Sequence, residues 1–192
     1  MKKNSCANIM TVTSKRLCEQ SDQPYVIAED INNDGAKQFR GFNTIYEMMK
    51  YVEAQPVKHF HEVMKGIGPR KLYFDADRKA DEGSFPDMLD FVNDMRKTVI
   101  YSIKVLFNID IENNDICFTE SHTINKFSSH IIIPSLNTSV DNMKILYDVV
   151  SKTMNKISPL YTKILDPAVY KSNQTLRMIN CSKMGKDNTK KL

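Results

Sequence analysis

The sequence predicts an α+β fold that contains a β-α-β-β-α-β module of the ferredoxin-like kind at about residues 70–184. Two observations lead to this prediction. The chain has 192 residues and 41% hydrophobic content, enough for one substantial domain or two small lobes. In the module region, short apolar runs of strand length alternate with two longer segments of helical periodicity. We expect residues 37–192 to form the folded core, preceded by a polar arm at residues 1–36.

The arm is rich in Asn, Asp, Ser and Lys, and its one short apolar run, Tyr25–Ala28, predicts a loosely ordered segment or a single edge strand. Beyond the arm, Thr44 and Glu47 stand at the spacing of a capping box. Apolar residues then recur at helical intervals until the chain reaches Pro56. A helix is therefore expected at residues 44–54.

The module is predicted from four strands and two helices. The strands are expected at residues 71–77, 115–121, 127–134 and 175–182. The first helix is expected to open at Ser84, with Asp87 at capping-box spacing. The second is expected to open at Thr138, with Asp141 at the same spacing. The apolar stripes of the two helices are Phe85, Met88, Val92, Met95, Val99 and Ile103, and Met143, Leu146, Val150, Met154 and Ile157. The polar link His122–Lys126 is short enough for a hairpin.

Two strands of the module that are far apart in sequence are expected to lie side by side. Split βαβ connections are usually right-handed, which places the first and third strands next to each other. Side chains alternate along a strand, so Asp75 and Asp77 share one face of the first strand. For the same reason Ser128 and His130 share one face of the third strand. The sequence therefore predicts one cluster of four polar side chains.

The two acids of this cluster predict a divalent metal site. Asp75 and Asp77 would lie roughly 7 Å apart at Cα, near enough to hold one or two hard cations with a third oxygen donor. Asp166, which follows the second helix, is the natural third ligand. Nucleotidyl transfer needs such a site, because two metals activate the attacking hydroxyl and neutralise the triphosphate. An isolated Asp-x-Asp is more often a solvated strand end, so the prediction depends on its neighbours.

Donors suited to phosphate are expected beside the acids. Ser128 and His130 would each be unremarkable alone, but next to a metal site they are the donor pair that a triphosphate requires. Arg177 interrupts an otherwise apolar strand, where a cation needs an anionic partner. Lys183 follows shortly after it. These residue types together indicate a binding site for a nucleotide.

Three segments resemble, in order, the three motifs of the archaeo-eukaryotic primase superfamily. They read LYFDAD at residues 72–77, KFSSHIII at residues 126–133 and DPAVYKSNQTLRMINCSKMGK at residues 166–186. The likeness covers about residues 40–186 and is greatest to PrimPol and to the primase portions of large DNA-virus helicase-primases, including the poxvirus kind. Upstream, HFHEVMKGIGPRKLYFDAD also looks like the PrimPol approach to the first motif.

The resemblance implies a two-lobed DNA-dependent primase/polymerase core with nucleic acid crossing its cleft. Such a protein makes or extends primers on a single-stranded DNA template from NTPs or dNTPs, with Mg²⁺ or Mn²⁺ in a two-metal site. The metal ligands implied by the resemblance are Asp75, Asp77 and Asp166. The residues implied to bind the incoming nucleotide are Ser128, His130, Arg177, Lys183 and Lys126.

Two departures from the family pattern affect these expectations. Asp77 stands where PrimPol typically has Glu, and its shorter arm alters the expected preference between Mg²⁺ and Mn²⁺. No zinc-binding module or helicase follows the motifs in this sequence. We therefore expect either an excised catalytic domain, fused to a helicase in the longer protein, or a minimal protein that uses a replicative helicase as partner.

The composition narrows the setting of the protein. Lys and Arg exceed Asp and Glu by 27 to 23, a net charge of +4 that permits nucleic acid as partner. The cysteines include no C-x-x-C pair, which argues against a zinc ribbon or a disulfide framework. No apolar run approaches the roughly 18 residues of a membrane span, and no signal peptide is evident. We expect an intracellular protein, cytoplasmic or nuclear. The Asn-, Lys- and Ile-rich composition without Trp suggests an AT-rich genome, such as that of a large DNA virus, so the setting would be a virus-infected host cell.

Two other functions remain open at this point. His59-Phe60-His61 matches the metal motif of rolling-circle HUH-type nickases, which would need Tyr147 or Tyr161 as nucleophile. Neither tyrosine is followed by the Lys three residues on that often accompanies that nucleophile. The second alternative is a non-catalytic RRM-like nucleic-acid-binding subunit, which would stack bases on aromatic residues of its central strands. The acids expected on those strands argue against it, because a carboxylate pair repels phosphate without a metal.

Overall fold

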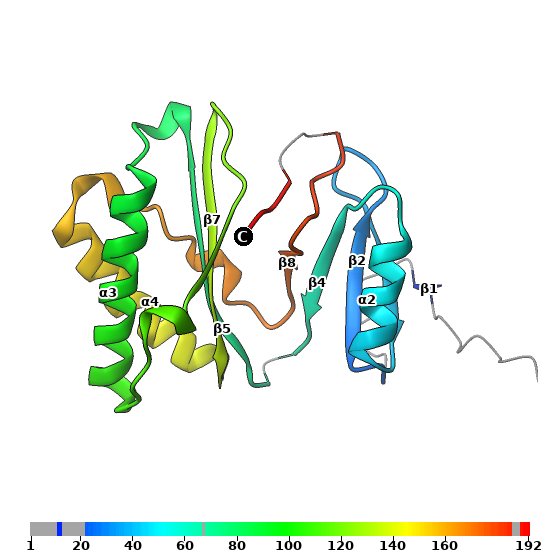
Figure 1. Ribbon diagram of the computed structural model, residues 1–192, viewed down its shortest axis with the longest axis horizontal. Helices are drawn as coiled ribbons and strands as arrows, with labels where there is room; N and C mark the ends of the chain where they lie inside the picture. The colour runs from blue at the N-terminus through cyan, green and yellow to red at the C-terminus, as the bar shows by residue number, and fades with distance from the viewer. Residues whose placement is uncertain (1–10, 13–21, 67, 186–188) are drawn as a thin grey trace, which may run out of the picture. The chain divides into compact units, whose positions relative to one another are not determined.

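The computed structural model describes residues 11–12, 22–66, 68–185 and 189–192. In this part of the chain the protein is a mixed α+β structure with three α-helices and two antiparallel sheets. The chain divides into two compact units (Figure 1). The first unit consists of the described residues of Met1–Gly66 and Asn173–Lys190, and the second of those of Ile67–Ser172 and Lys191–Leu192.

The first unit is a five-stranded sheet with one helix on it. The sheet order is β1-β3-β2-β4-β8. The strands are β1 (Thr11–Val12), β2 (Tyr25–Asp30), β3 (Lys37–Phe42), β4 (Phe60–Met64) and β8 (Gln174–Arg177). Helix α2 (Ile45–Ala54) packs on one face of this sheet, where it closes a core of Ile27, Phe42, Met48, Val52, Phe60 and Cys181. The helix begins at Thr44 with both reciprocal bonds to Glu47, which confirms the predicted capping box.

The apolar run in the predicted arm is an interior strand, so the expectation of a loose segment or an edge strand was wrong. Strand β2 pairs with β3 on one side and β4 on the other. Val26, Ile27 and Ala28 are all buried. A short apolar run predicts a strand, but its place in the sheet depends on β4, which lies about thirty residues further along the chain.

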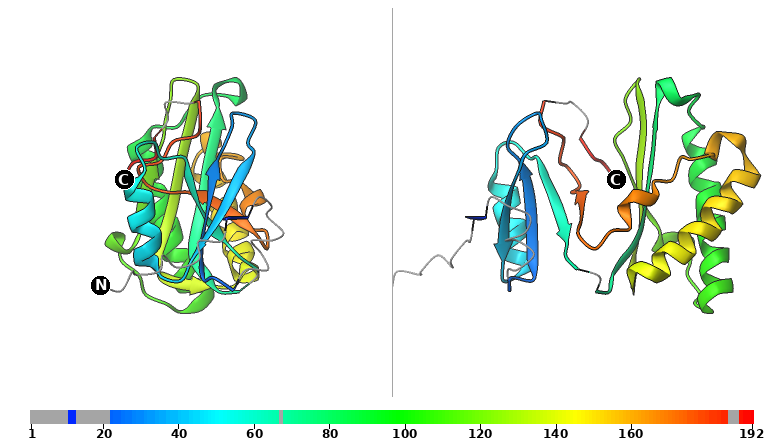
Figure 2. Two further views of the ribbon diagram at one scale, coloured as in Figure 1. Left: turned by 90° about the vertical axis from the view of Figure 1, so that its right-hand side faces the viewer. Right: turned by 180° about the vertical axis from the view of Figure 1, so that it is seen from behind.

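The second unit is a three-stranded sheet in the order β5-β7-β6. Its strands are β5 (Arg70–Lys79), β6 (Cys117–Glu120) and β7 (Lys126–Thr138), and its helices are α3 (Met88–Phe107) and α4 (Val140–Ile157). Both helices lie on the same side of the sheet (Figures 1 and 2). Phe127 of β7 packs edge-on against Phe91 of α3, so the odd-numbered residues of β7 face the helices. The predicted hairpin is confirmed, since β6 and β7 pair through the His122–Lys126 link.

Both helices of this unit begin later than the sequence predicted. Helix α3 begins at Met88, because Asp87 is its N-cap and accepts a hydrogen bond from the Asp90 amide. Pro86 restricts the residue before it to extended backbone, so Phe85 precedes the helix and does not belong to its stripe. Helix α4 is capped by Ser139, one residue after the expected position.

The predicted fourth strand of the module joins the other sheet. Strand β8 pairs with β4 of the first unit, so the complete β-α-β-β-α-β sheet is not formed. The position beside β5 is filled instead by an isolated bridge between Ala76 and Leu165. Two backbone hydrogen bonds hold this bridge: the Asp77 amide donates to the Ile164 carbonyl, and the Asp166 amide donates to the Asp75 carbonyl, each at 2.8 Å. The topology is therefore ferredoxin-like with its last strand reduced to one bridge.

The expectations that the chain has no membrane span and no disulfide framework can be compared with the described residues only. Among them, no helix has both the length and the apolarity needed to cross a bilayer. Cys117 and Cys181 are free thiols. Cys6 and Cys18 lie outside the described residues.

Candidate active site

The pairing of β5 with β7 brings the four predicted polar side chains together. Asp75 lies directly opposite His130, and Asp77 lies directly opposite Ser128. Partners in an antiparallel pair project from the same face of the sheet. This is the face opposite α3 and α4, because the intervening pair Ala76 and Ser129 has the parity that faces the helices. The prediction that these residues share one face of neighbouring strands is confirmed.

His130 and Ser128 are almost fully buried on this face. Their exposed fractions are 6% and 2%. His130 Nε2 is 3.8 Å from Asp75 Oδ1, so the imidazole and the carboxylate are close enough to influence each other. Asp75 itself keeps 17% of its side-chain surface accessible. Asp75 and His130 therefore place a carboxylate and an imidazole side by side on the sheet, both largely removed from solvent.

Lys126 at the start of β7 contacts the second acid. Its Nζ donates to Asp77 Oδ2 at 2.6 Å. Asp77 Oδ1 is buried and makes no hydrogen bond with any described residue. A buried carboxylate oxygen of this kind carries a desolvation penalty unless a cation or donor compensates it. Asp77 thus has one carboxylate oxygen, Oδ2, paired with the Lys126 ammonium, and one, Oδ1, whose desolvation is not offset by any hydrogen bond among the described residues.

Asp166 is held beside the other acids by its backbone. Besides the bond from its amide to the Asp75 carbonyl, its side chain accepts a hydrogen bond from the Ala168 amide at 2.7 Å. The short 3₁₀ helix Pro167–Val169 is capped in this way. The structure therefore brings all three predicted acids to one end of β5. Within the described part of the chain, however, no three His, Cys, Asp or Glu side chains are grouped closely enough to hold a metal ion.

Three tyrosines fix the segment that carries Asp166, and sequence reasoning assigned none of them this role. Tyr73 donates to the Val169 carbonyl at 2.6 Å, Tyr170 donates to the Tyr73 carbonyl at 3.1 Å, and Tyr147 of α4 donates to the Leu165 carbonyl at 3.2 Å. Burial raises the pKa of Tyr73 to about 12 and that of Tyr170 well above its usual value. Both hydroxyls therefore keep the proton they donate.

His122 holds the start of β7 and was also missed as a site residue. The Ser128 amide donates to His122 Nδ1 at 2.9 Å, and the Ser128 carbonyl accepts from the Ser121 amide at 3.0 Å. Because Nδ1 accepts, the ring hydrogen is on Nε2, which lies 3.5 Å from Glu120 Oε2. The ring packs on Phe127 with centroids 4.6 Å apart. The sequence shows a histidine in the hairpin link, but it does not reveal that this histidine accepts a hydrogen bond from the Ser128 amide.

A groove of about 410 Å³ opens beside these acids within the second unit. Its lining residues are Asp77, Arg78, Lys79, Glu82, Lys126, Tyr147, Lys163, Leu165, Asp166 and Pro167. Both basic and acidic side chains line it, so it suits a ligand of mixed charge, such as a polyphosphate accompanied by cations.

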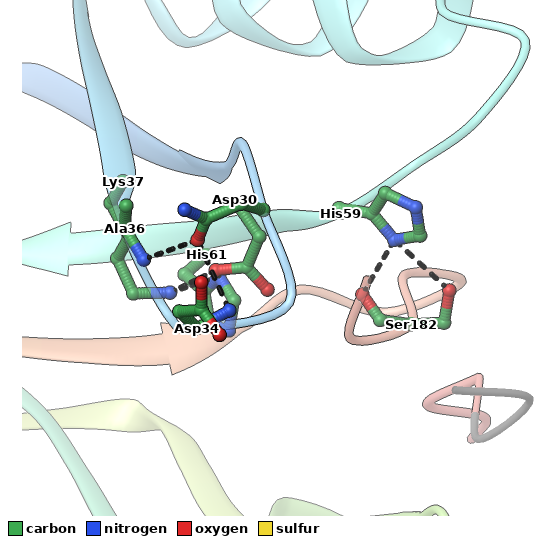
Figure 3. Close-up of polar contacts among 8 residues, drawn as sticks. Asp30, Asp34, Ala36, Lys37, His59, His61 and Ser182 are labelled. Atoms are coloured by element: carbon green, nitrogen blue, oxygen red, sulfur yellow. Dashed lines mark hydrogen bonds and ion pairs between the residues drawn. The ribbon is translucent and has the colours of Figure 1, made fainter. Parts of the chain in front are cut away.

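The other two predicted nucleotide-binding residues, Arg177 and Lys183, belong to the first unit. Arg177 lies directly opposite His61 in the β4–β8 pair and is only 9% exposed. Lys37 forms an ion pair with Asp30 and lies 3.3 Å from His61 Nδ1 (Figure 3). The structure thus brings six of the eight predicted site residues together in the second unit and puts these two in a separate basic cluster.

Burial holds His61 in its neutral form. It lowers the pKa of His61 to about 4, and the positive charges of Lys37, Arg177 and Lys183 add to this effect while Asp30 opposes it. A neutral His61 can accept a hydrogen from the Lys37 ammonium at Nδ1. The cluster therefore avoids a further positive charge beside its cations.

The two histidines of the nickase motif, His59 and His61, contact different partners. His59 Nδ1 lies 3.1 Å from the Ser182 carbonyl and 3.2 Å from its hydroxyl, whereas His61 contacts Lys37 (Figure 3). The two tyrosines considered as nucleophiles are also engaged. Tyr161 is 4% exposed, and its hydroxyl donates to Asp94 at 2.9 Å. The hydroxyl of Tyr147 bonds to the Leu165 carbonyl, as above. The geometry therefore does not support a nickase centre here.

Comparison with known proteins shows distant viral relatives. No protein-family model matches the chain. It is 27% identical to a "Putative helicase/primase complex protein" of African swine fever virus isolate Pig/Kenya/KEN-50/1950, over 84% of this chain and 16% of that protein. The corresponding protein of strain Badajoz 1971 Vero-adapted is 27% identical over 91% of the chain, and that of isolate Tick/Malawi/Lil 20-1/1983 is 28% identical over 91%. The chain spans about one sixth of the length of these relatives. It is thus distantly similar, over most of its own length, to one segment of a viral helicase/primase complex protein.

Proposed function

We propose that this chain is a primase/polymerase catalytic core that performs metal-dependent nucleotidyl transfer on a single-stranded DNA template. The observation that carries the proposal is the β5–β7 register, which sets Asp75 opposite His130 and Asp77 opposite Ser128. Two acids and two phosphate-type donors on one face, with Asp166 bonded to the same strand, form the set of groups that nucleotidyl transfer needs. The similarity to a viral helicase/primase complex protein supports the same reaction.

The three acids supply the type of donor that a hard divalent cation prefers, although in this structure their side chains are not yet grouped as a complete ligand set. Carboxylate oxygens are the ligands that Mg²⁺ and Mn²⁺ prefer. Asp77 Oδ1 is buried with no hydrogen bond among the described residues, and its Oδ2 is already paired with a cation, the ammonium of Lys126. We propose that Asp75, Asp77 and Asp166 hold the metal. When bound, such ions lower the pKa of an attacking hydroxyl and neutralise charge on the departing pyrophosphate.

The chain's own groups would position the nucleotide. His130 and Ser128 can donate hydrogen bonds to phosphate oxygens, and their burial makes each bond stronger than it would be in water. Lys126, at the start of the same strand, adds a positive charge beside these donors. His122 and the three tyrosines would keep these donors and Asp166 in place before substrate arrives. We also propose, from the family resemblance, that Arg177 and Lys183 of the first unit bind phosphate of the incoming nucleotide.

A helicase is the partner that this function suggests. The relatives are named for a helicase/primase complex and are about six times as long as the matched segment. A primase core needs single-stranded template, which a helicase supplies. We propose that the chain works with a replicative helicase, either fused to it or bound to it, in a virus-infected cell.

The proposal is tested with the wild-type protein, primed and unprimed single-stranded DNA, labelled NTPs or dNTPs, and Mg²⁺ or Mn²⁺. We expect template-dependent products that require a divalent ion. A covalent 5′-phosphotyrosyl adduct without synthesis would identify a nickase instead. Binding of the DNA without either product would identify a non-catalytic subunit.

A further inference from the structure

Lys163 has a backbone conformation that is unusual for its residue type. Its φ is +59°, in the left-handed region. Of the three described non-glycine residues with positive φ, the other two, Asn108 and Asn180, are asparagines, which tolerate this region well. Lysine has no side-chain group that compensates the steric conflict of its Cβ. Such a residue persists only where its surroundings enforce the conformation.

Hydrogen bonds on both sides enforce the conformation of Lys163. The carbonyl of Thr162 accepts from the guanidinium of Arg78, which is buried and also bonds to the Ser84 carbonyl. The Ile164 amide donates to the Tyr161 carbonyl at 3.2 Å. The Ile164 carbonyl accepts from the Asp77 amide, as part of the bridge that replaces the fourth strand. The backbone around Lys163 is therefore tied to the strand that carries the acids.

Glycine would fit this backbone without strain, so the lysine side chain needs another reason to be there. Lys163 is exposed and lines the groove together with Asp77, Lys126 and Asp166. A lysine at this point adds a cation on a long flexible stem to the rim of the proposed metal site. The strain, the groove and the charge point to a ligand with dense negative charge.

We propose that Lys163 binds the polyphosphate of the incoming nucleotide at the groove beside Asp77 and Asp166. This inference rests on the proposed nucleotidyl transfer and adds a residue to it. A polyphosphate is favoured over a DNA strand because a triphosphate concentrates its charge within a groove of about 410 Å³. Single-stranded DNA instead spreads its charge along a track of basic contacts.

The test compares four variants of the full chain. Lys163→Gly and Lys163→Ala remove the ammonium, Lys163→Arg keeps the charge, and Lys152→Ala removes one exposed lysine of α4 that does not line the groove. Affinity for inorganic tripolyphosphate with Mg²⁺ is measured by calorimetry at fixed salt. We expect the Gly and Ala variants to bind about tenfold more weakly, and the Arg and Lys152 variants to stay within about twofold of wild type.

Melting temperatures provide a second, independent measurement. Lys163→Gly relieves the backbone strain that Lys163→Ala retains, so the Gly variant should melt about 2–4 °C above the Ala variant. A Gly variant that melts below the Ala variant would remove the strain argument and overturn the proposal. So would a wild-type protein that fails to bind tripolyphosphate, or Gly and Ala variants that bind it normally.

The source of the phosphate is distinguished with an oligodeoxynucleotide that carries no triphosphate. The Lys163 variants should bind it like wild type; a loss there with unchanged tripolyphosphate binding would assign Lys163 to DNA and overturn the proposal. The outcome is separable from that of the proposed function. If wild type makes no product but the tripolyphosphate pattern holds, the Lys163 site stands and the primase assignment fails.

Discussion

The two units carry polar clusters of opposite charge balance. In the first unit, Lys37, Asp30, His61 and Arg177 share one face of the sheet, and the positive charge of Lys183 also acts on the neutral His61. In the second unit, three acids gather at one strand end with one contacting lysine: Asp75, Asp77, Asp166 and Lys126. The first cluster favours an anion and the second favours a cation.

The clusters also differ in how they are assembled. In the second unit, the strands that carry the acids and donors pair with each other through a hairpin and a single helical crossover. In the first unit, β8 comes from more than a hundred residues beyond its partner β4. Short connections make pairing predictable from sequence order, whereas a distant strand can join any available edge. This difference explains why the second cluster was anticipated and the first was not.

The largest effect is expected from removing the acids of the second unit. Asp75→Ala combined with Asp77→Ala should reduce nucleotide incorporation by about 10³-fold or more, because two of the three proposed metal ligands are lost. The fold should survive, since the Asp77–Lys126 pair is partly exposed and contributes less than about 1 kcal/mol. Mn²⁺ should raise the melting temperature of wild type and not of the variant. Near-normal synthesis, or equal thermal shifts, would place the metal elsewhere.

A smaller effect is expected from removing one proposed phosphate-binding side chain from each unit. His130→Ala and Arg177→Ala should each raise the nucleotide KM by about tenfold, because each removes a charge-assisted hydrogen bond worth about 1.5–3 kcal/mol. If phosphate charge grows toward the transition state, kcat should fall as well. Template affinity should hardly change, because it is spread over many contacts. Primer extension with varied nucleotide is run beside a template-binding titration. Loss of template affinity at constant KM would assign that residue to the DNA path.

The buried histidine of the first unit should make stability depend on pH. The pKa of His61 is about 4 in the folded protein and near 6.5 when unfolded, so between these values the unfolded state binds more protons. Stability should therefore fall as pH drops from 7 to 5, by about 1–2 kcal/mol from this group. Urea unfolding of wild type and His61→Gln at both pH values measures the difference. Equal pH slopes in the two proteins would show that His61 is not held neutral.

The smallest effect is expected from the hairpin histidine of the second unit. His122→Ala removes the acceptor for the Ser128 amide, which should cost about 1 kcal/mol and raise the nucleotide KM about fivefold. His122→Asn should recover part of this loss, because its side-chain oxygen can replace Nδ1 as acceptor. Hydrogen exchange at the Ser128 amide should accelerate in the Ala variant. A KM change without faster exchange would mean that His122 acts in another way.

Several features of the site could be predicted because they depend on neighbours in sequence. The period of two along a strand puts Asp75 and Asp77 on one face, and the capping box places Thr44 at the start of α2. The short polar link after Glu120 makes a hairpin and so orients Ser128. The roles of these residues in metal and nucleotide binding stay predictions, as do those of Arg177 and Lys183.

Only the tertiary structure decided the contacts between segments that are far apart in sequence. It replaced the fourth strand of the module by the Leu165 bridge, which is what holds Asp166 at β5. It also paired Lys126 with Asp77 and buried His61 among cations. Local patterns depend on sterics and hydrogen bonds within a few residues, which the sequence alone determines. The partner of a sheet edge, the acceptor of a tyrosine hydroxyl and the pKa of a histidine depend on which distant groups share its burial, and no local pattern carries that information.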